Sequence, residues 1–201
     1  MSSFSRQALE NFVKTIDVNC ERCLDIGGSQ NPIKGRTKSW NVQDYKILDL
    51  LQPHEVKRQP DIVLDINEPI EVNQMLNEIV PLGKFDAVFC LEVSEYWYNP
   101  FEALKNISHF TKDKGILYIS AHFIYPLHPP HQKDYLRYTK YGIEKLLEKT
   151  GFEIVDYIPR HSVSNGGTLY DYWLKEMMRF DRLESIEELT DIGCMIKAIK
   201  K

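Results

Sequence analysis

Apolar residues recur along the chain in two patterns, one with the spacing of helices and one typical of buried strands. Residues 3–16 have helical spacing and predict an amphipathic helix at the N-terminus. Seven short apolar runs are typical of strands, at residues 22–26, 45–50, 61–66, 85–91, 116–120, 152–158 and 194–199. Strands and helices alternate almost throughout. This order predicts a single doubly wound, mostly parallel seven-stranded sheet with helices on both faces.

Capping residues place the boundaries of several predicted helices. A helix begins at Asn67-Glu68-Pro69 and keeps helical period to residue 80. Asn99 and Thr139 cap two more, and Gly151 follows the second. An aromatic helix is predicted over residues 169–180. After the first strand, glycine and threonine interrupt the pattern, so the segment that follows should be short or irregular rather than a long helix.

Composition narrows the class of protein. The 201 residues are 43% hydrophobic and 27% charged, which is ordinary for a soluble globular domain. A net charge of −4 argues against a nucleic-acid-binding surface. No apolar run reaches the roughly 18 residues of a membrane span, and we see no signal peptide. Four cysteines are too few for a disulfide scaffold, so we expect a cytoplasmic protein with reduced thiols.

The first strand ends in an acid and is followed at once by two glycines. Asp25 lies in this strand, and Gly27 and Gly28 let the backbone turn where a side chain would collide. In open α/β folds this arrangement forms a nucleotide-binding crevice, although a plain tight turn has the same appearance. Two further strands also end in acids, Asp49 and Asp65. Asp49 follows Asp25 by 24 positions (49 − 25), near the spacing of a ribose-binding acid.

Taken in order, these motifs resemble the class I S-adenosylmethionine-dependent methyltransferases. The resemblance rests on Asp25-Ile-Gly-Gly28, Leu48-Asp49 and Leu64-Asp65-Ile66, and it covers about residues 20–158. The fourth-strand run from Phe85 to Glu95 and the turn from Thr111 into the fifth strand also match. The family fold implies a cofactor-binding half at residues 20–120. Residues 1–18 would be an N-terminal helix, and residues 121–201 would supply the substrate-side loop, helices and last strands of one domain, 1–201.

The resemblance also implies roles for individual residues toward S-adenosylmethionine. Gly27 and Gly28 would pass close to the methionine part, with Asp25 near its amino group. Asp49 would accept hydrogen bonds from the ribose, and Asp65 and the Ile66 backbone would contact the adenine. The remaining residues that the resemblance places around the cofactor are Ser29, Leu50, Cys90 and Leu91. Ser29 departs from the family, in which glycine is commoner there.

Substrate-side candidates gather after the fifth predicted strand. The segment 122–138 is rich in His, Pro and Tyr and should leave the sheet at the cofactor edge. We predict that His131 is a general base oriented by Asp134, with Glu95 as a further catalytic candidate. His128, Arg137 and Tyr96 are the predicted substrate-binding residues, although packing in the loop is an equal alternative for each. Tyr96 stands where the family often has a catalytic His.

Together these observations predict methyl transfer from S-adenosylmethionine to a small molecule, with an oxygen acceptor favoured and a sugar or glycan precursor suggested. A nicotinamide-dependent oxidoreductase is the main rival, since Tyr141 and Lys145 have a suitable spacing. That class needs further fingerprint glycines, and none lies between Gly28 and Gly35. A nucleic-acid methyltransferase and a non-catalytic cofactor-binding module are two further rivals. The histidines of segment 122–138 are interrupted by prolines, so we expect no metal; the sequence does not indicate an oligomeric state.

Overall fold

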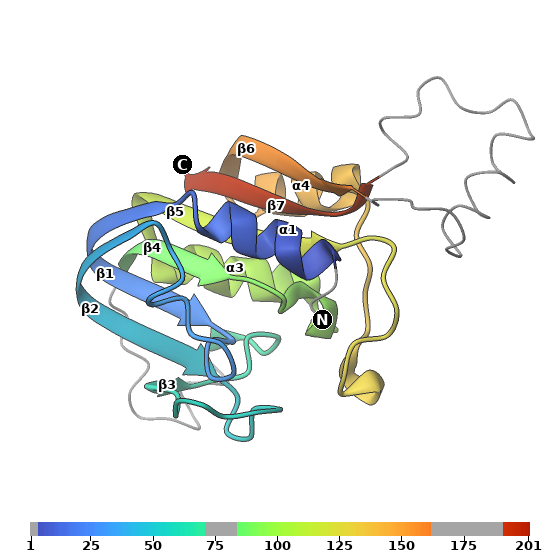
Figure 1. Ribbon diagram of the computed structural model, residues 1–201, viewed down its shortest axis with the longest axis horizontal. Coiled ribbons are helices and arrows are strands. Elements are labelled where there is room, and N and C mark those ends of the chain that lie inside the picture. The colour runs from blue at the N-terminus through green and yellow to red at the C-terminus, as the bar shows by residue number, and fades with distance from the viewer. Residues whose placement is uncertain (1–3, 71–83, 162–190) are drawn as a thin grey trace, which may run out of the picture.

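The computed structural model describes residues 4–70, 84–161 and 191–201 (Figure 1). Within them, seven strands form one sheet in the order β3-β2-β1-β4-β5-β7-β6. Strands β1 (Asp17–Ile26), β2 (Ser39–Asp49), β3 (Ile62–Val63), β4 (Phe85–Cys90) and β5 (Thr111–His122) run parallel. Strand β7 (Asp191–Lys200) is antiparallel to both β5 and β6 (Phe152–His161). The predicted mostly parallel, seven-stranded sheet is therefore confirmed.

Local signals predict the starts of the helices after Asn99 and Thr139, whereas the N-terminal helix ends before residue 16, to which its apolar pattern runs. Helix α1 is Phe4–Val13. In α3 (Pro100–Phe110) the Asn99 side chain accepts a hydrogen bond from the Glu102 N–H at 3.4 Å. In α4 (Lys140–Lys149) Thr139 Oγ1 accepts one from the Gly142 N–H at 3.1 Å. These caps satisfy backbone donors that a helix leaves unpaired at its start. The predicted helix over 169–180 and most of the one over 67–80 lie outside the described residues.

Most strands differ in length from the prediction: β1, β2, β5, β6 and β7 are longer and β3 is shorter. β1 and β2 begin earlier than predicted, because Asp17–Cys20 pair with Ser39–Val42 beyond the end of β4. β3 is shorter, with only Ile62 and Val63 in the ladder. The Asp65 carboxylate there accepts hydrogen bonds from the Asn67 N–H and side-chain amide, both at 3.0 Å, and this turn ends the strand.

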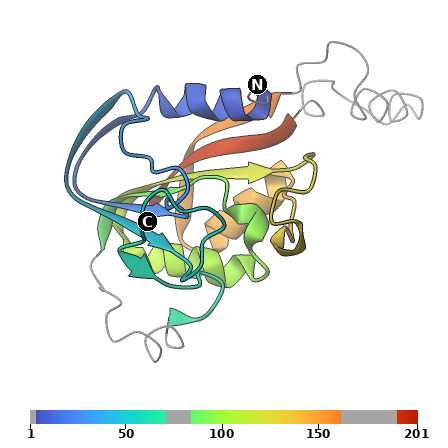
Figure 2. The same ribbon diagram turned by 60° about the horizontal axis from the view of Figure 1, so that its bottom comes forward.

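The apolar core has two clusters, to which neighbouring residues of the same strand contribute alternately. Leu24 and Ile26 belong to the cluster that includes the buried residues of α3 and α4. Cys23 belongs to the other, together with Leu9, Phe12 and Val13 of α1. Strand geometry explains this, since successive side chains point to opposite faces of a sheet. Figure 2 shows α1 beside β6 and β7.

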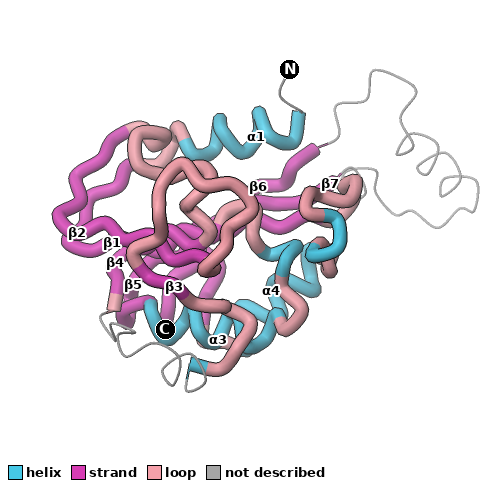
Figure 3. The backbone as a smooth tube through the Cα atoms, turned by 90° about the horizontal axis from the view of Figure 1, so that it is seen from below, coloured by secondary structure: helices cyan, strands magenta, loops and turns pink. Residues whose placement is uncertain are grey.

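Segment 27–38 contains turns and no helix, where the sequence predicts a short or irregular segment instead of a long helix. It lies against the segment that follows β2, because the Lys57 and Arg58 N–H groups donate to the Ser29 carbonyl at 2.9 and 3.1 Å. Figure 3 shows both connections together at one end of the parallel strands. No helix of the described ranges is long and apolar enough to cross a membrane.

Candidate active site

A cavity of about 480 Å³ opens at the carboxyl ends of β1, β2 and β4. Parallel sheets of this kind place ligands at that edge. Ten of the residues singled out from the sequence line it: Asp25, Gly27, Gly28, Asp49, Leu50, Asp65, Ile66, Leu91, Tyr96 and His128. The other six do not line it: Ser29, Cys90, Glu95, His131, Asp134 and Arg137. The motifs from distant parts of the chain thus meet around one space.

The Asp25 carboxylate fixes the backbone that follows β1. It is almost buried, and its Oδ2 accepts hydrogen bonds from the Tyr45 hydroxyl at 2.6 Å and the Ile33 N–H at 2.7 Å. Burial raises the pKa of Asp25 to about 6, although these two hydrogen bonds act in the opposite direction. The Asp25 carboxylate therefore holds segment 27–38 against the sheet through its hydrogen bond from Ile33.

Two glycines after β1 lie where a side chain would collide with its neighbours. A Cβ at Gly28 would lie 2.4 Å from Asp25 Oδ2, and one at Gly27 would lie 2.4 Å from a Val93 methyl group. Gly27 also has φ +73°, which favours glycine. The glycine-lined backbone at this wall fits the close approach of a ligand such as the methionine part of S-adenosylmethionine.

Asp49 lines the cavity at the end of β2. Its carboxylate accepts hydrogen bonds from the Leu50 N–H at 2.8 Å and the Ser29 N–H at 3.2 Å. A carboxylate has about four acceptor positions, so it retains capacity toward a ligand in the cavity. Ser29 itself is fully buried, and its backbone ties the two connections together. Cys90 is fully buried in the core, one residue before the cavity-lining Leu91.

The far end of the cavity is built around Asn67. Its side-chain oxygen accepts hydrogen bonds from the Tyr98 N–H at 3.0 Å and the Asn99 N–H at 3.4 Å. Its amide donates to Asp65, which lines the cavity beside Ile66. Asn67 thus joins the end of β3 to the start of α3 and holds both predicted adenine-side residues in place.

The expected pairing of His131 with Asp134 is not the one that the structure has. The Asp134 carboxylate accepts hydrogen bonds from two Arg137 nitrogens and from the His128 N–H, the latter at 2.5 Å. A planar guanidinium binds a carboxylate at two points, which makes it the stronger partner. His131 lies exposed in the 3₁₀ helix η2 (His131–Lys133). Arg137 also donates to the Tyr125 and Pro126 carbonyls, so this pair braces the loop.

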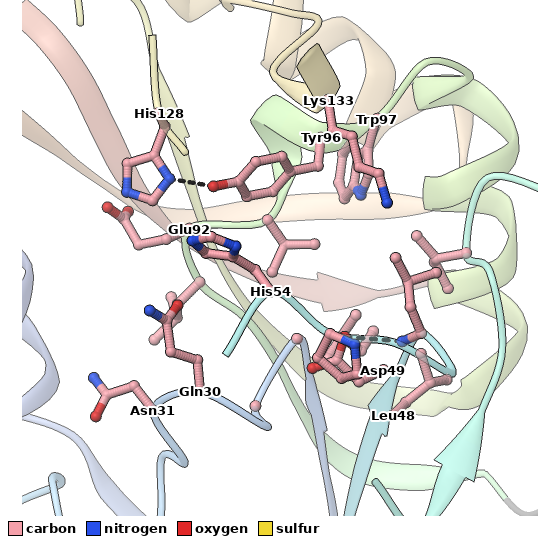
Figure 4. Close-up of a pocket in the computed structure, with 18 of the residues that line it drawn as sticks. Gln30, Asn31, Leu48, Asp49, His54, Glu92, Tyr96, Trp97, His128 and Lys133 are labelled. Carbon is pink, nitrogen blue, oxygen red and sulfur yellow. Dashed lines mark hydrogen bonds between the residues drawn. The ribbon is translucent and has the colours of Figure 1, made fainter. Parts of the chain in front are cut away.

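His128 takes the position facing the cavity, and Tyr96 contacts its ring (Figure 4). The Tyr96 hydroxyl lies against His128 Nδ1 and donates its proton to the Pro129 carbonyl at 2.7 Å. Because a carbonyl only accepts, Nδ1 must be the donor in the other contact, which leaves the lone pair on Nε2. Partial burial lowers the pKa of His128, so the ring is neutral near pH 7.

A buried charged cluster behind this wall was not predicted from the sequence. Glu92 lines the cavity, and its carboxylate contacts Arg160 Nη2 at 2.5 Å and His122 Nε2 at 3.1 Å. Glu95 lies behind it, 1% exposed, with Oε1 3.7 Å from His122 Nε2. Burial, and then the negative charge of Glu92, raise the pKa of Glu95 to about 7. Glu92 is part of the fourth-strand motif, but Arg160 is distant in sequence and no local signal joins the two.

Comparison with known proteins identifies the fold. No protein-family model and no curated protein matches the chain. An S-adenosylmethionine-dependent methyltransferase from Mesorhizobium loti superposes with a TM-score of 0.60 at 12% identity, covering 99% of each chain. One from Leishmania major gives 0.58 at 11% identity, covering 98% of this chain and 72% of that one. The cyclase SpnF gives 0.52 at 15% identity, covering 98% and 80%.

At these identities the likeness shows the fold alone. The chain has the Rossmann-like fold of the class I S-adenosylmethionine-dependent methyltransferases, as its motifs predict. Because a protein described as a cyclase shares this fold, the reaction must be argued from the site itself.

Proposed function

We propose that the protein is an S-adenosylmethionine-dependent methyltransferase acting on the hydroxyl group of a small molecule. The observation that carries the proposal is the meeting of three sequence-distant elements at one cavity: the Gly27-Gly28 turn, the Asp49 carboxylate and the Asp65-Ile66 turn. The glycine turn lets a ligand approach the backbone closely, the Asp49 carboxylate accepts hydrogen bonds from hydroxyl groups, and the Asp65-Ile66 turn provides polar groups. This is the set that the methionine, ribose and adenine parts of the cofactor require.

The cofactor side of the cavity is assigned by chemistry. Asp49 accepts hydrogen bonds from the ribose, and Asp65 with the Ile66 backbone contacts the adenine. Leu50 and Leu91 supply apolar walls. Asp25 acts near the methionine amino group, and it also holds the turn that follows β1. Ser29 and Cys90 act indirectly, through the backbone tie and the core packing described above.

On the acceptor side, the proposed general base is His128. S-adenosylmethionine, when bound, supplies a methyl group already activated by its positive sulfur. Methyl transfer would form a bond between the acceptor oxygen and the methyl carbon and break the carbon–sulfur bond, leaving S-adenosylhomocysteine. The acceptor hydroxyl would give its proton to the free lone pair of His128 Nε2. Tyr96 holds the ring in the required tautomer. Asp134 fixes the backbone N–H of His128, and Arg137 fixes Asp134.

The fold and the site support further assignments within this proposal. We infer one domain over residues 1–201, doubly wound, with helices on both faces of the sheet. The cofactor is bound by the half at 20–120, and the acceptor is oriented by the loop after β5. The acceptor class we favour is a sugar or glycan precursor, and the expected location is the cytoplasm. A nicotinamide oxidoreductase remains less favoured because the glycine fingerprint is missing after Gly28.

The experiment is a transfer assay with S-adenosylmethionine and a panel of alcohols, phenols and sugars, with release of S-adenosylhomocysteine as the readout. The wild type should release it only when a suitable hydroxyl compound is present. His128→Asn keeps an N–H donor toward Tyr96 but removes the basic nitrogen, and it should lower turnover about 10²–10⁴-fold. Cofactor binding without release across the panel would favour the non-catalytic module, and equal turnover in the variant would refute the base assignment.

A further inference from the structure

Arg160 is a fully buried cation that the proposed mechanism does not use. It belongs to β6, and its guanidinium reaches three other parts of the chain. Nη1 donates to Ser5 Oγ of α1 at 3.1 Å, Nε lies 3.1 Å from Met195 Sδ of β7, and Nη2 contacts Glu92 Oε1 at 2.5 Å. A buried charge is costly unless it is paired, so Glu92 is the partner that makes this position tolerable.

Contacts with Ser120, His122 and Arg160 fix the position of the Glu92 carboxylate. The Glu92 backbone has φ +59°, an uncommon conformation for a residue other than glycine. The Glu92 N–H donates to Ser120 Oγ at 2.8 Å, and Ser120 Oγ donates back to Glu92 Oε1 at 2.8 Å. Burial alone would raise the pKa of Glu92, but Arg160 and His122 reverse this effect and hold it well below the usual value. Glu92 is therefore a fixed negative charge.

This charge faces His128. Glu92 lines the cavity, and in Figure 4 its carboxylate lies beside the His128 ring, on the side away from Tyr96. The other charged groups that act on His128 come from the surrounding elements. Glu92 and Asp134 favour the protonated ring, whereas His122 and Arg6 oppose it. Among the groups favouring protonation, Glu92 acts most strongly.

We propose that Arg160 is a positioning residue of the methyl-transfer site, which acts through Glu92 to stabilise the proton that His128 Nε2 takes from the acceptor hydroxyl. This inference rests on the proposed function. Arg160 keeps the Glu92 carboxylate ionised and oriented. Glu92 then offsets the positive charge that develops on the imidazole ring during proton transfer. Through Ser5, the same guanidinium joins α1 to this arrangement.

A double-mutant cycle read by NMR tests this inference without cofactor or acceptor. The pKa of His128 is measured from its ring signals in the wild type, Glu92→Gln, Arg160→Met and the double variant. In the wild-type background, Glu92→Gln should lower the pKa of His128 by about one unit, because the negative charge of Glu92 favours the protonated ring. In the Arg160→Met background, Glu92 loses the partner that lowers its pKa most, while His122 remains, so Glu92→Gln should have a much smaller effect.

Two controls keep the cycle decisive. Glu148→Gln removes an exposed carboxylate of α4 and should leave the pKa of His128 unchanged. Arg160→Lys keeps the buried positive charge but has a single nitrogen, which cannot contact both Ser5 and Glu92 as the guanidinium does. Because Glu92 then stays ionised, Glu92→Gln should keep most of its effect in the Arg160→Lys background. If Arg160→Met does not fold, Arg160→Gln, which is also uncharged, replaces it.

An equal effect of Glu92→Gln in both backgrounds would overturn the role of Arg160, and no effect in the wild-type background would overturn that of Glu92. Because the cycle needs no turnover, its failure is distinguishable from failure of the proposed function. Intact coupling without methyl transfer contradicts only the proposed function, and methyl transfer without coupling contradicts only this inference.

Discussion

Glu95 makes an unusual contribution to stability that can be measured directly. Its side chain is 1% exposed, and neither carboxylate oxygen has a hydrogen-bond partner among the described residues. Burial and the neighbouring Glu92 charge raise its pKa to about 7, from the ordinary 4.5. The native state therefore favours the protonated carboxyl. We predict that Glu95→Gln, which is close in shape and cannot ionise, becomes increasingly stable relative to the wild type as the pH rises.

The sign and size follow from linkage. A folded-state pKa above the unfolded one contributes stability that is fully present below pH 4.5 and is lost as the pH rises through 7. The difference of about 2.5 units, at 1.36 kcal/mol each, corresponds to about 3 kcal/mol of unfolding free energy. Between pH 4 and pH 8, the stability of Glu95→Gln minus that of the wild type should thus increase by about 3 kcal/mol.

Urea unfolding followed by tryptophan fluorescence at a series of pH values measures this difference. The slope from other groups, such as Asp25 with its raised pKa, is present in both proteins and cancels. Glu148→Gln, on the exposed face of α4, serves as the control and should show no comparable increase. A difference that does not vary with pH would refute the buried, protonated state of Glu95. A difference that falls with rising pH would show instead that Glu95 is ionised and paired with His122.

Three further predictions concern the cavity. Asp49→Ala should weaken S-adenosylmethionine binding by about 1.5–3 kcal/mol per lost hydrogen bond in calorimetry, and unchanged affinity in a folded variant would refute the ribose assignment. Gly28→Ala should lower cofactor affinity and the midpoint of thermal unfolding together, because its Cβ would lie 2.4 Å from Asp25 Oδ2; wild-type values for both would show that the loop relaxes freely. His131→Ala should leave turnover unchanged, whereas His128→Asn should lower it, and the reverse order would restore His131 as the base.

The fold was predictable where the signals are local. The caps at Asn99 and Thr139 depend on residues within three positions of each other, and the structure confirms both. The alternation of strands and helices likewise indicated the parallel sheet. The length of β3 was not predictable in the same way, because the apolar run continues to Ile66 while the turn between Asp65 and Asn67 ends the strand.

In the candidate site, too, the residues placed by local sequence were predictable, and those placed by distant contacts were not. The cofactor-side residues follow strands directly, so the order of the strands brings Asp49 and Asp65 together. On the acceptor side, His131 and Asp134 have a plausible local spacing, but Arg137 lies equally close to Asp134 and binds it at two points. The contact between Arg160 and Glu92 joins residues 68 positions apart. Only the packing of β6 against β7 and α1 brings them together, and no local pattern carries that information.

The central claim is that the cavity binds S-adenosylmethionine, and calorimetry with S-adenosylhomocysteine, S-adenosylmethionine and NADH tests it most directly. We expect the first two to bind with one site per chain and to raise thermal stability, as any ligand specific to the native state does, by about 2.7 kcal/mol at a hundredfold excess over Kd. NADH should give no heat of binding. Binding of NADH alone, or of none of the three, would contradict the account.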